Sequence, residues 1–516
     1  MKTKVMTLEK AIGLIKDGDS VVTAMAGNIG NAAYLTKGVE SSFLEKGTPK
    51  NLTKYSGCGH RDAVFAHPGL LKRFVGSHPG PCDPIMKMID ENAIEAYGLP
   101  QGVMQHLYRC TAARQPGLLS KVGMGTYVDP RLEGGRLNGI SKDSLSQIMQ
   151  INGEDYIFYK SFPIDIALLR GTTADENGNI SIEEEALKME TLELALAVKS
   201  SKGKVIVQVK NVVSNGSIKA KDVVIPGEAV DAVVVAQELE TYHMQTNKTF
   251  YSPFLSGELK ASKSAIAPPP EVLNMTEVVC RRAVYELYPG AVVNVGVGMG
   301  VGVCAVAAVE DMVERMTFTV VLGVFGGTPT PRGDFGASRN PTSFISHPSM
   351  FDFYHGGGLD IAFLGSAEVD AEGNVNVSRF GEIKAGRAQG GFIDISQSAK
   401  KVVFCFSLKA GDFKAEVIEG KIKIHEEGRE AKFVEKVQQI TFNGKLAVER
   451  GQEIVYITER GVFKLTKEGV MLTEIAPGID LEKDILGQMA FKPLVSKELK
   501  VMDSRIFKPG RMGCFD

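Results

Sequence analysis

An internal repeat constrains this chain more than any other feature of its sequence. Residues 165–182 read DIALLRGTTADENGNISI and residues 360–377 read DIAFLGSAEVDAEGNVNV, and the two align without a gap. A Gly-Asn turn at 178–179 matches one at 373–374. Each copy is typical of an apolar strand, a turn in which glycine supplies a positive φ, and a second strand. The repeat therefore predicts two related halves.

Two weaker pairs of segments occur in the same order around this repeat. Residues 11–25 and 283–297 each read as an amphipathic helix, a Gly-containing turn and a β-branched strand. Residues 204–213 and 400–410 each read as a strand that follows the repeat. Chance similarity between ordinary strand–turn–strand units is the alternative. Three pairs in one order favour a duplicated α/β fold.

The length of the chain agrees with two halves. A chain of 516 residues is too long for one hydrophobic core. The proline run APPP at 267–270 is typical of a stiff, extended connector. We therefore predict one domain over residues 1–265 and a second over residues 266–516. In duplicated α/β proteins the site usually lies between the halves, at the carboxyl ends of the strands.

Composition and charge exclude several kinds of partner. The formal net charge of −2 provides no basic surface for nucleic acid or an anionic membrane, so we expect a small-molecule substrate. Charges interrupt the first residues, and no later stretch is apolar enough to span a bilayer. The seven cysteines lie far apart without a CxxC pair, which favours a reducing, cytoplasmic location without structural zinc or disulfides.

Several glycine-rich loops are candidates for ligand contact. GVGMG at 296–300 follows an apolar strand, and HGGGLD at 355–360 and QGGF at 389–392 lie in the same half. Glycines at the end of a buried strand let the backbone approach a ligand closely. A plain tight turn is the alternative, and the spacing is not the GxGxxG of dinucleotide sites. The candidate residues are Gly296, Gly298, Gly357, Gly358, Gly391 and Phe392.

The order of these motifs resembles the acetate/propionate branch of the family I coenzyme A transferases. The similar segments in the second half are GVG, FGAS, GGGLD, GGFIDIS, ITFNG, YITERGVF and LTEIAPGIDL, and those in the first half include FLEKGTPKNLT, KVGMGTYVDPR and VVIPG. The resemblance implies two related open α/β domains of the CoA-transferase fold with mostly parallel sheets. It also implies an acyl-CoA thioester bound between the halves and a homo-oligomer.

The resemblance also identifies a departure from the chemistry of that family. The family glutamate attacks the acyl-CoA thioester and forms acyl-glutamyl and glutamyl-CoA intermediates. It stands in a T-x-E-(S/N)-G stretch, whose counterpart here is TVVLG at 319–323. Val321 occupies the position of the glutamate, and valine has no lone pair with which to attack. Gly326 and Gly327 follow as the glycine pair expected at the ligand.

A loop in the first half differs from the family as well. The family reads roughly S-G-F-V-G-N-A-x-P where this chain reads AMAGNIGNA at 24–32. Met25 replaces a glycine and Ala32 replaces a proline. The resemblance implies that this loop helps to form the acyl pocket. The residues expected at the substrate are Met25, Gly27, Asn28 and Asn31.

Four polar residues are candidates for a replacement chemistry: His60, Asp334, His347 and His355. A histidine beside an aspartate can act as a general base that activates water. Two histidines with a carboxylate can instead bind a metal ion that does the same. There is no HxH or HExxH spacing, and ordinary satisfied polar residues are the alternative. Glu382, which follows SRFG, is the best spare carboxylate.

Three functional hypotheses follow. The first is an enzyme that keeps the scaffold but uses water to hydrolyse a thioester or to cleave the carbon–carbon bond of a small diketone. The second is a genuine short-chain CoA-transferase whose nucleophile has moved, with Glu382 as the candidate. The third is an acyl-CoA binder or partner subunit without activity, which is weakened because one chain contains both halves. We favour the first, because the loops around Val321 changed together with the glutamate.

Overall fold

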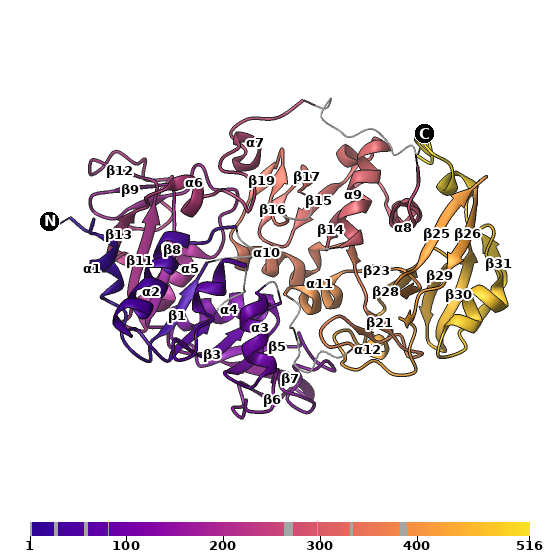
Figure 1. Cartoon of the computed structure of the whole chain (residues 1–516), viewed down its shortest axis with the longest axis horizontal. Helices are drawn as coiled ribbons and strands as arrows, with labels where there is room; N and C mark the ends of the chain where they lie inside the picture. The colour runs from indigo at the N-terminus through magenta and orange to yellow at the C-terminus, as the bar shows by residue number, and fades with distance from the viewer. Residues whose placement is uncertain are drawn as a thin grey trace.

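Two large sheets, one in each half of the chain, organise this computed structural model (Figure 1). The structure describes residues 3–24, 29–55, 60–80, 82–262, 272–296, 298–330, 334–381, 387 and 390–515. The predicted division near residue 265 and the APPP connector lie outside these residues, so the division stays a prediction. No helix in the described ranges is long and apolar enough to cross a membrane.

The first half contains a sheet of seven parallel strands. Its order is β13 (Ala232–Val235), β11 (Lys204–Val209), β8 (Ile166–Arg170), β1 (Ser20–Thr23), β2 (Leu52–Tyr55), β3 (Leu71–Gly76) and β4 (Glu95–Gly98). The central strands β1 and β8 are buried along their whole length. Such short, continuous apolar runs form strands that are covered on both faces.

The second half contains a sheet of ten strands. Its order is β19 (Ser343–Phe344), β16 (Val324–Phe325), β15 (Thr317–Val320), β14 (Val292–Val295), β20 (Ile361–Leu364), β23 (Lys401–Cys405), β28 (Glu453–Ile457), β29 (Gly461–Thr466), β30 (Gly469–Ile475) and β31 (Leu494–Val501). The strands from β15 to β28 are parallel. β16, β19, β29 and β30 extend the sheet with antiparallel pairs. The prediction of mostly parallel α/β sheets is confirmed.

The sequence repeat corresponds to a structural repeat. In the first half β8 leads into the antiparallel pair β9 (Thr173–Asp175) and β10 (Ile180–Ser181), and in the second half β20 leads into β21 (Glu368–Val369) and β22 (Val375–Asn376). The Asp175 carboxylate accepts the Asn179 backbone N–H at 3.0 Å, and Asp370 accepts that of Asn374 at 3.0 Å. The order β11-β8-β1-β2 matches β23-β20-β14-β15.

Helices cover the sheets and join the halves. α4 (Gln101–Ala112) of the first half contacts α10 (His347–Phe353) and α11 (Phe392–Ser398) of the second, at the centre of Figure 1. The apolar core of the first half also includes Val320, Leu322, Val324 and Ala337. The halves therefore share one continuous core beside the end of β15. The other α-helices are α1 (Leu8–Ile12), α2 (Ala33–Lys46), α3 (Asp83–Asp90), α5 (Thr191–Ser200), α6 (Leu239–Tyr242), α7 (Pro253–Ser256), α8 (Met275–Ala283), α9 (Met299–Val309) and α12 (Gly444–Glu449).

Candidate active site

Val321 lies where the two halves meet. It directly follows β15 and is partly exposed. A Cβ atom at Gly391 would lie 3.2 Å from the Val321 Cγ2 atom, 3.3 Å from Oε1 of Gln101 and 3.3 Å from Cδ1 of Ile395. Val321 and Gln101 thus flank the same backbone turn, and the three atoms nearest to this Cβ position belong to uncharged side chains. A substrate carbonyl placed here would meet methyl groups, backbone and one carboxamide.

Gln101 is the functional candidate that the sequence analysis missed. It is the first residue of α4 and is 8% exposed. Its backbone N–H donates to the carbonyl of Gly390 at 3.1 Å, and the Gly390 N–H donates to the carbonyl of Ser77 at 2.7 Å. The Gln101 carboxamide has no hydrogen-bond partner within the described residues. The side chain retains some exposure at the junction of the halves, so its carboxamide is available to a ligand or to water.

The buried carboxylate of Asp394 joins α4, which begins at Gln101, to α11, which follows Gly391. Asp394, in the first turn of α11, is fully buried. Its Oδ2 atom accepts the backbone N–H of Gly102 at 3.0 Å, and its Oδ1 atom lies 3.1 Å from Nε2 of His355. The His106 ring packs edge-on against His355 at 5.3 Å between centroids. Burial, followed by the charge of His355, lowers the pKa of His106, which therefore favours the neutral ring.

Comparison with known proteins agrees with this architecture. Residues 5–236 match the family model of the coenzyme A transferases. The chain is 44% identical to the caffeate CoA-transferase of Acetobacterium woodii, over 98% of this chain and 97% of that protein. It is 40% identical to the acetate CoA-transferase YdiF of Escherichia coli K12, over 99% of this chain and 96% of that protein. The chain belongs to the family I coenzyme A transferases.

A solved structure of the family supports the same assignment. The crystal structure of acyl-CoA transferase YdiF from E. coli O157:H7, described as a thioester complex with CoA, covers 99% of this chain and 97% of its own length, with a TM-score of 0.92 and 38% identity. The predicted family and fold are thereby confirmed. The homo-oligomer and the cytoplasmic location stay predictions, as does the assignment of Val321 to the position of the family glutamate.

In this member of the CoA-transferase family, three of the four predicted catalytic side chains have separate partners. His355 contacts Asp394 as described above. His347 is buried, and its Nδ1 atom lies 2.9 Å from Oε2 of Glu190. Asp334 accepts from Oγ1 of Thr246 at 2.7 Å. His60 is exposed in the 3-10 helix η1 (His60–Phe65).

These positions leave the catalytic roles as predictions. Within the described ranges, the structure records no hydrogen bond, ion pair or ring contact between any two of His60, Asp334, His347 and His355. Those ranges also contain no cluster of three or more His, Cys, Asp or Glu residues that could hold a metal ion. Glu382, the predicted spare carboxylate, lies outside the described residues. His355 is linked to the junction at Val321 through Asp394, which binds both His355 and Gly102.

The predicted ligand-binding glycines fall into three groups. Protein atoms fill the space that a side chain would need at four positions: Gly296 against Leu364, Gly326 against Thr342, Gly327 against Arg339, and Gly358 against Phe353. Gly298 and Gly357 have positive φ angles and face open space. Gly391 alone among these glycines lies beside Val321. Packing therefore accounts for the first group, Gly298 and Gly357 leave room for a ligand, and Gly391 is closely surrounded by Val321, Gln101 and Ile395.

The remaining predicted contact residues are placed only in part. Met25, Gly27 and Asn28 lie outside the described residues. Asn31 is 1% exposed, and Phe392 is buried with its ring 6.1 Å from that of Phe404. Their expected roles at the substrate stay predictions.

Proposed function

We propose that this chain binds the CoA thioester of a small carboxylic acid between its halves and cleaves that thioester with water. The observation that carries the proposal is the position of Val321, whose apolar side chain stands beside Gly391 and Gln101 at the junction of the halves. The choice of a CoA thioester rests on the CoA-transferase relatives and on the YdiF complex with CoA. Cleavage of a diketone would use the same attack of water on a carbonyl, but these relatives favour the thioester.

The junction offers a simple route for this reaction. Water adds to the thioester carbonyl carbon, the carbon–sulfur bond breaks, and the CoA thiolate leaves with a proton from the attacking water. The Gln101 carboxamide, whose Oε1 atom faces Gly391, turns its Nε2 atom toward the carbonyl oxygen and donates an N–H as negative charge develops there. His355 is the predicted base with a structural link to this junction, through Asp394. The apolar Val321 side chain leaves no carboxylate to compete with water for the carbonyl.

A second candidate function is favoured by the similarity over nearly the whole chain to two CoA-transferases. In that alternative the chain transfers CoA between short-chain carboxylates through a nucleophile at another position. Glu382 remains the candidate for that nucleophile.

Trapping with borohydride or hydroxylamine distinguishes the two functions. The native protein is incubated with acetyl-CoA or propionyl-CoA, treated with either reagent, and weighed by intact mass spectrometry. We expect an unmodified mass, release of free CoA, and a rate independent of added acetate. A glutamate modified by the reagent would contradict the proposal and identify the relocated nucleophile. Glu382→Gln would then show whether that residue carries the label.

Loss of the Gln101 carboxamide should impair the reaction without unfolding the chain. Gln101→Leu keeps the size of the side chain but removes the donor beside Val321, so we expect kcat/KM for acetyl-CoA to fall about 10–100-fold. Gln105→Leu is the matched control, because it makes the same change in a buried residue of the same helix. Equal effects of the two substitutions would show that Gln101 supports the helix rather than the substrate.

A further inference from the structure

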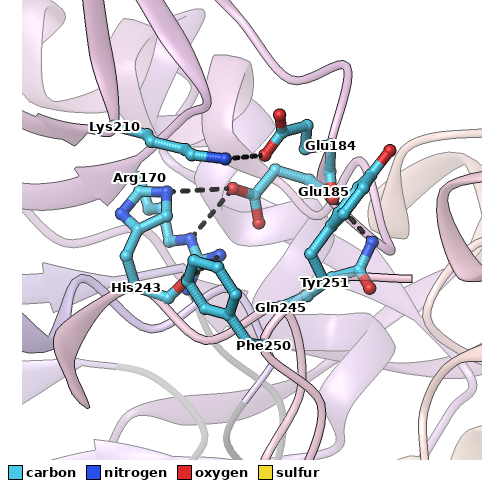
Figure 2. Close-up of a pocket in the computed structure, with 8 residues that line it drawn as sticks. All are labelled: Arg170, Glu184, Glu185, Lys210, His243, Gln245, Phe250 and Tyr251. Atoms are coloured by element: carbon cyan, nitrogen blue, oxygen red, sulfur yellow. Dashed lines mark hydrogen bonds and ion pairs between the residues drawn. The ribbon is translucent and has the colours of Figure 1, made fainter. Parts of the chain in front are cut away.

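A segment of the first half ties the two halves together at Asp334. Residues 243–252, which we call the strap, follow α6 and lie across the carboxyl ends of β8 and β11 (Figure 2). Arg170, at the end of β8, donates to the carbonyl of Met244 at 2.6 Å. Gln208 of β11 donates to Nδ1 of His243 at 3.1 Å. The strap is therefore anchored to two strands of the first sheet.

The charged side chains that line the small pocket beneath the strap neutralise one another, so the pocket offers a ligand no net charge. Arg170 pairs with Glu185 at 2.9 Å, and Lys210 pairs with Glu184 at 2.7 Å (Figure 2). Burial alone would raise the pKa of Glu185, but the charge of Arg170 and the contact with His243 outweigh it and lower the pKa to about 2. Each cation is thus neutralised by a carboxylate. This pocket holds the strap in place and does not select an ion.

The middle of the strap reaches the second half. Thr246, which is fully buried, donates its hydroxyl to Oδ1 of Asp334 at 2.7 Å. The backbone N–H of Lys248 donates to the same oxygen at 2.9 Å. The Thr249 hydroxyl donates to Oδ2 of Asp334 at 3.4 Å, so Asp334 accepts three hydrogen bonds from a segment that is 85 or more residues away in sequence. These bonds fix the start of the turn at 334–337 against the first half.

The turn at 334–337 contributes Ala337 to the apolar cluster against which Val321 packs. The Thr330 backbone N–H donates to the carbonyl of Ala337 at 3.0 Å, and Ala337 is fully buried. A Cβ atom at Gly336 would lie 2.8 Å from Cδ1 of Leu322 and 3.1 Å from Cδ1 of Ile29. Leu322 and Ile29 belong to the apolar cluster against which Val321 packs, and Ile29 also belongs to the loop at which the acyl pocket is expected. A displacement of this turn therefore changes the space beside Val321.

We infer that Asp334 is a positioning residue, and that the strap holds it so that the turn at 334–337 limits the length of the acyl group accepted beside Val321. The inference rests on the proposed function for the nature of the substrate. Apolar walls discriminate between substrates by size. One additional methylene group in the acyl chain changes the ratio of kcat/KM values between two substrates by about 10–200-fold. When the bonds to Asp334 are removed, the turn is free to move away from Leu322 and Ile29. Longer acyl chains then gain access.

The test compares acyl-chain preference in two variants. Thr246→Val removes the hydroxyl without a change of shape, and Asp334→Ala removes the carboxylate that accepts the bonds from the strap. We expect the ratio of kcat/KM for hexanoyl-CoA to that for acetyl-CoA to rise at least about tenfold in both variants. Thr246→Ser, which retains the hydroxyl, should keep the native ratio. Thr241→Val is the matched control, because Thr241 is exposed in α6 just before the strap.

The outcomes separate this inference from the proposed function. If both variants change kcat/KM by the same factor for every chain length, the inference is wrong, because the strap then acts only on stability. If the native protein transfers CoA instead of hydrolysing the thioester, the proposed function fails, and the same ratio is measured with transfer as the readout. If the native protein consumes no thioester, the ratio of binding constants for hexanoyl-CoA and acetyl-CoA, measured by calorimetry, takes its place. An unchanged ratio contradicts the inference in every case.

Discussion

Replacement of Val321 by glutamate should produce a chain that captures coenzyme A covalently. The new carboxylate would follow β15, beside the Gln101 carboxamide and the turn at Gly391. In the chemistry that the family resemblance implies, the carboxylate attacks the thioester carbonyl and the CoA thiolate leaves. The thiolate then attacks the glutamyl carbonyl, the carboxylic acid is released, and a glutamyl-CoA thioester remains. The native chain cannot form this species at position 321.

The measurement is the intact mass after incubation of Val321→Glu with acetyl-CoA. We expect a gain equal to coenzyme A less one water, abolished by hydroxylamine. We also expect CoA transfer from acetyl-CoA to propionate to exceed that of the native chain at least about tenfold, which corresponds to about 1.4 kcal/mol of barrier. A carboxylate in a partly buried site should reduce stability by about 1 kcal/mol. This cost is small enough for a folded variant.

Val321→Gln is the matched control for this experiment. Glutamine has the size and polarity of the glutamate side chain, but its amide does not displace a thiolate. We expect neither the mass gain nor an increase in transfer. A Val321→Glu chain that binds acetyl-CoA yet remains unlabelled would show that position 321 does not meet the thioester carbonyl. The site at the end of β15 would then be misassigned.

Gly102→Ala should separate the two halves at their buried junction. A Cβ atom at this position would lie 2.5 Å from Oδ1 of Asp394 and 2.6 Å from Cδ1 of Phe351, both in the other half. Overpacking of this kind costs about 1–3 kcal/mol. Displacement of α4 would also weaken the 3.0 Å hydrogen bond from the Gly102 N–H to the Asp394 carboxylate, which contributes about 1.5–3 kcal/mol. We therefore expect a total loss of roughly 3–5 kcal/mol.

Activity should fall more steeply than stability in this variant. Gln101 precedes Gly102, and Gly391 stands three residues before Asp394, so a shift between α4 and α11 moves both residues that flank Val321. A displacement of about 1 Å can lower kcat about 100-fold. Denaturant unfolding, followed by kcat and KM for acetyl-CoA below the unfolding transition, checks both effects.

Gly139→Ala provides the comparison for Gly102→Ala. Gly139 is exposed in the same half, and a Cβ atom there would approach nothing closer than Oδ1 of Asn92 at 3.7 Å. We expect its stability and activity to stay near those of the native chain. If Gly102→Ala behaves in the same way, the contact between α4 and α11 tolerates more movement than the packing indicates, and it does not position Gln101.

Sequence patterns predicted the fold because the relevant signals are local. The repeat at 165–182 and 360–377 combines an apolar strand with a turn that reads DENGN in the first copy and DAEGN in the second. The Asp175 and Asp370 side chains close these turns by accepting backbone N–H groups four residues further along the chain. Burial of β1 and β8 follows from uninterrupted apolar runs. The family resemblance placed Val321, and the structure puts that residue at the end of a parallel strand, where α/β proteins bind ligands.

The candidate site was only partly predictable, since polar residues show no period that reveals their partners. Asp334 and His347 were selected for a general base, yet Asp334 accepts bonds from the strap and His347 pairs with Glu190. Gln101 was overlooked, because a glutamine at the start of a helix is ordinary in sequence. Its place at the candidate site becomes apparent only from its contacts with Gly390 and Gly391 of the other half.

By itself, the sequence determined the duplicated α/β architecture, the membership of the CoA-transferase family and the valine at position 321. Only the tertiary structure decided which side chains surround that valine. The bond between Gly102 and Asp394 joins residues 292 positions apart, and the contact of Thr246 with Asp334 spans 88. Strands and turns form from interactions between neighbours in the chain, whereas these contacts exist only after both halves have folded and packed against each other.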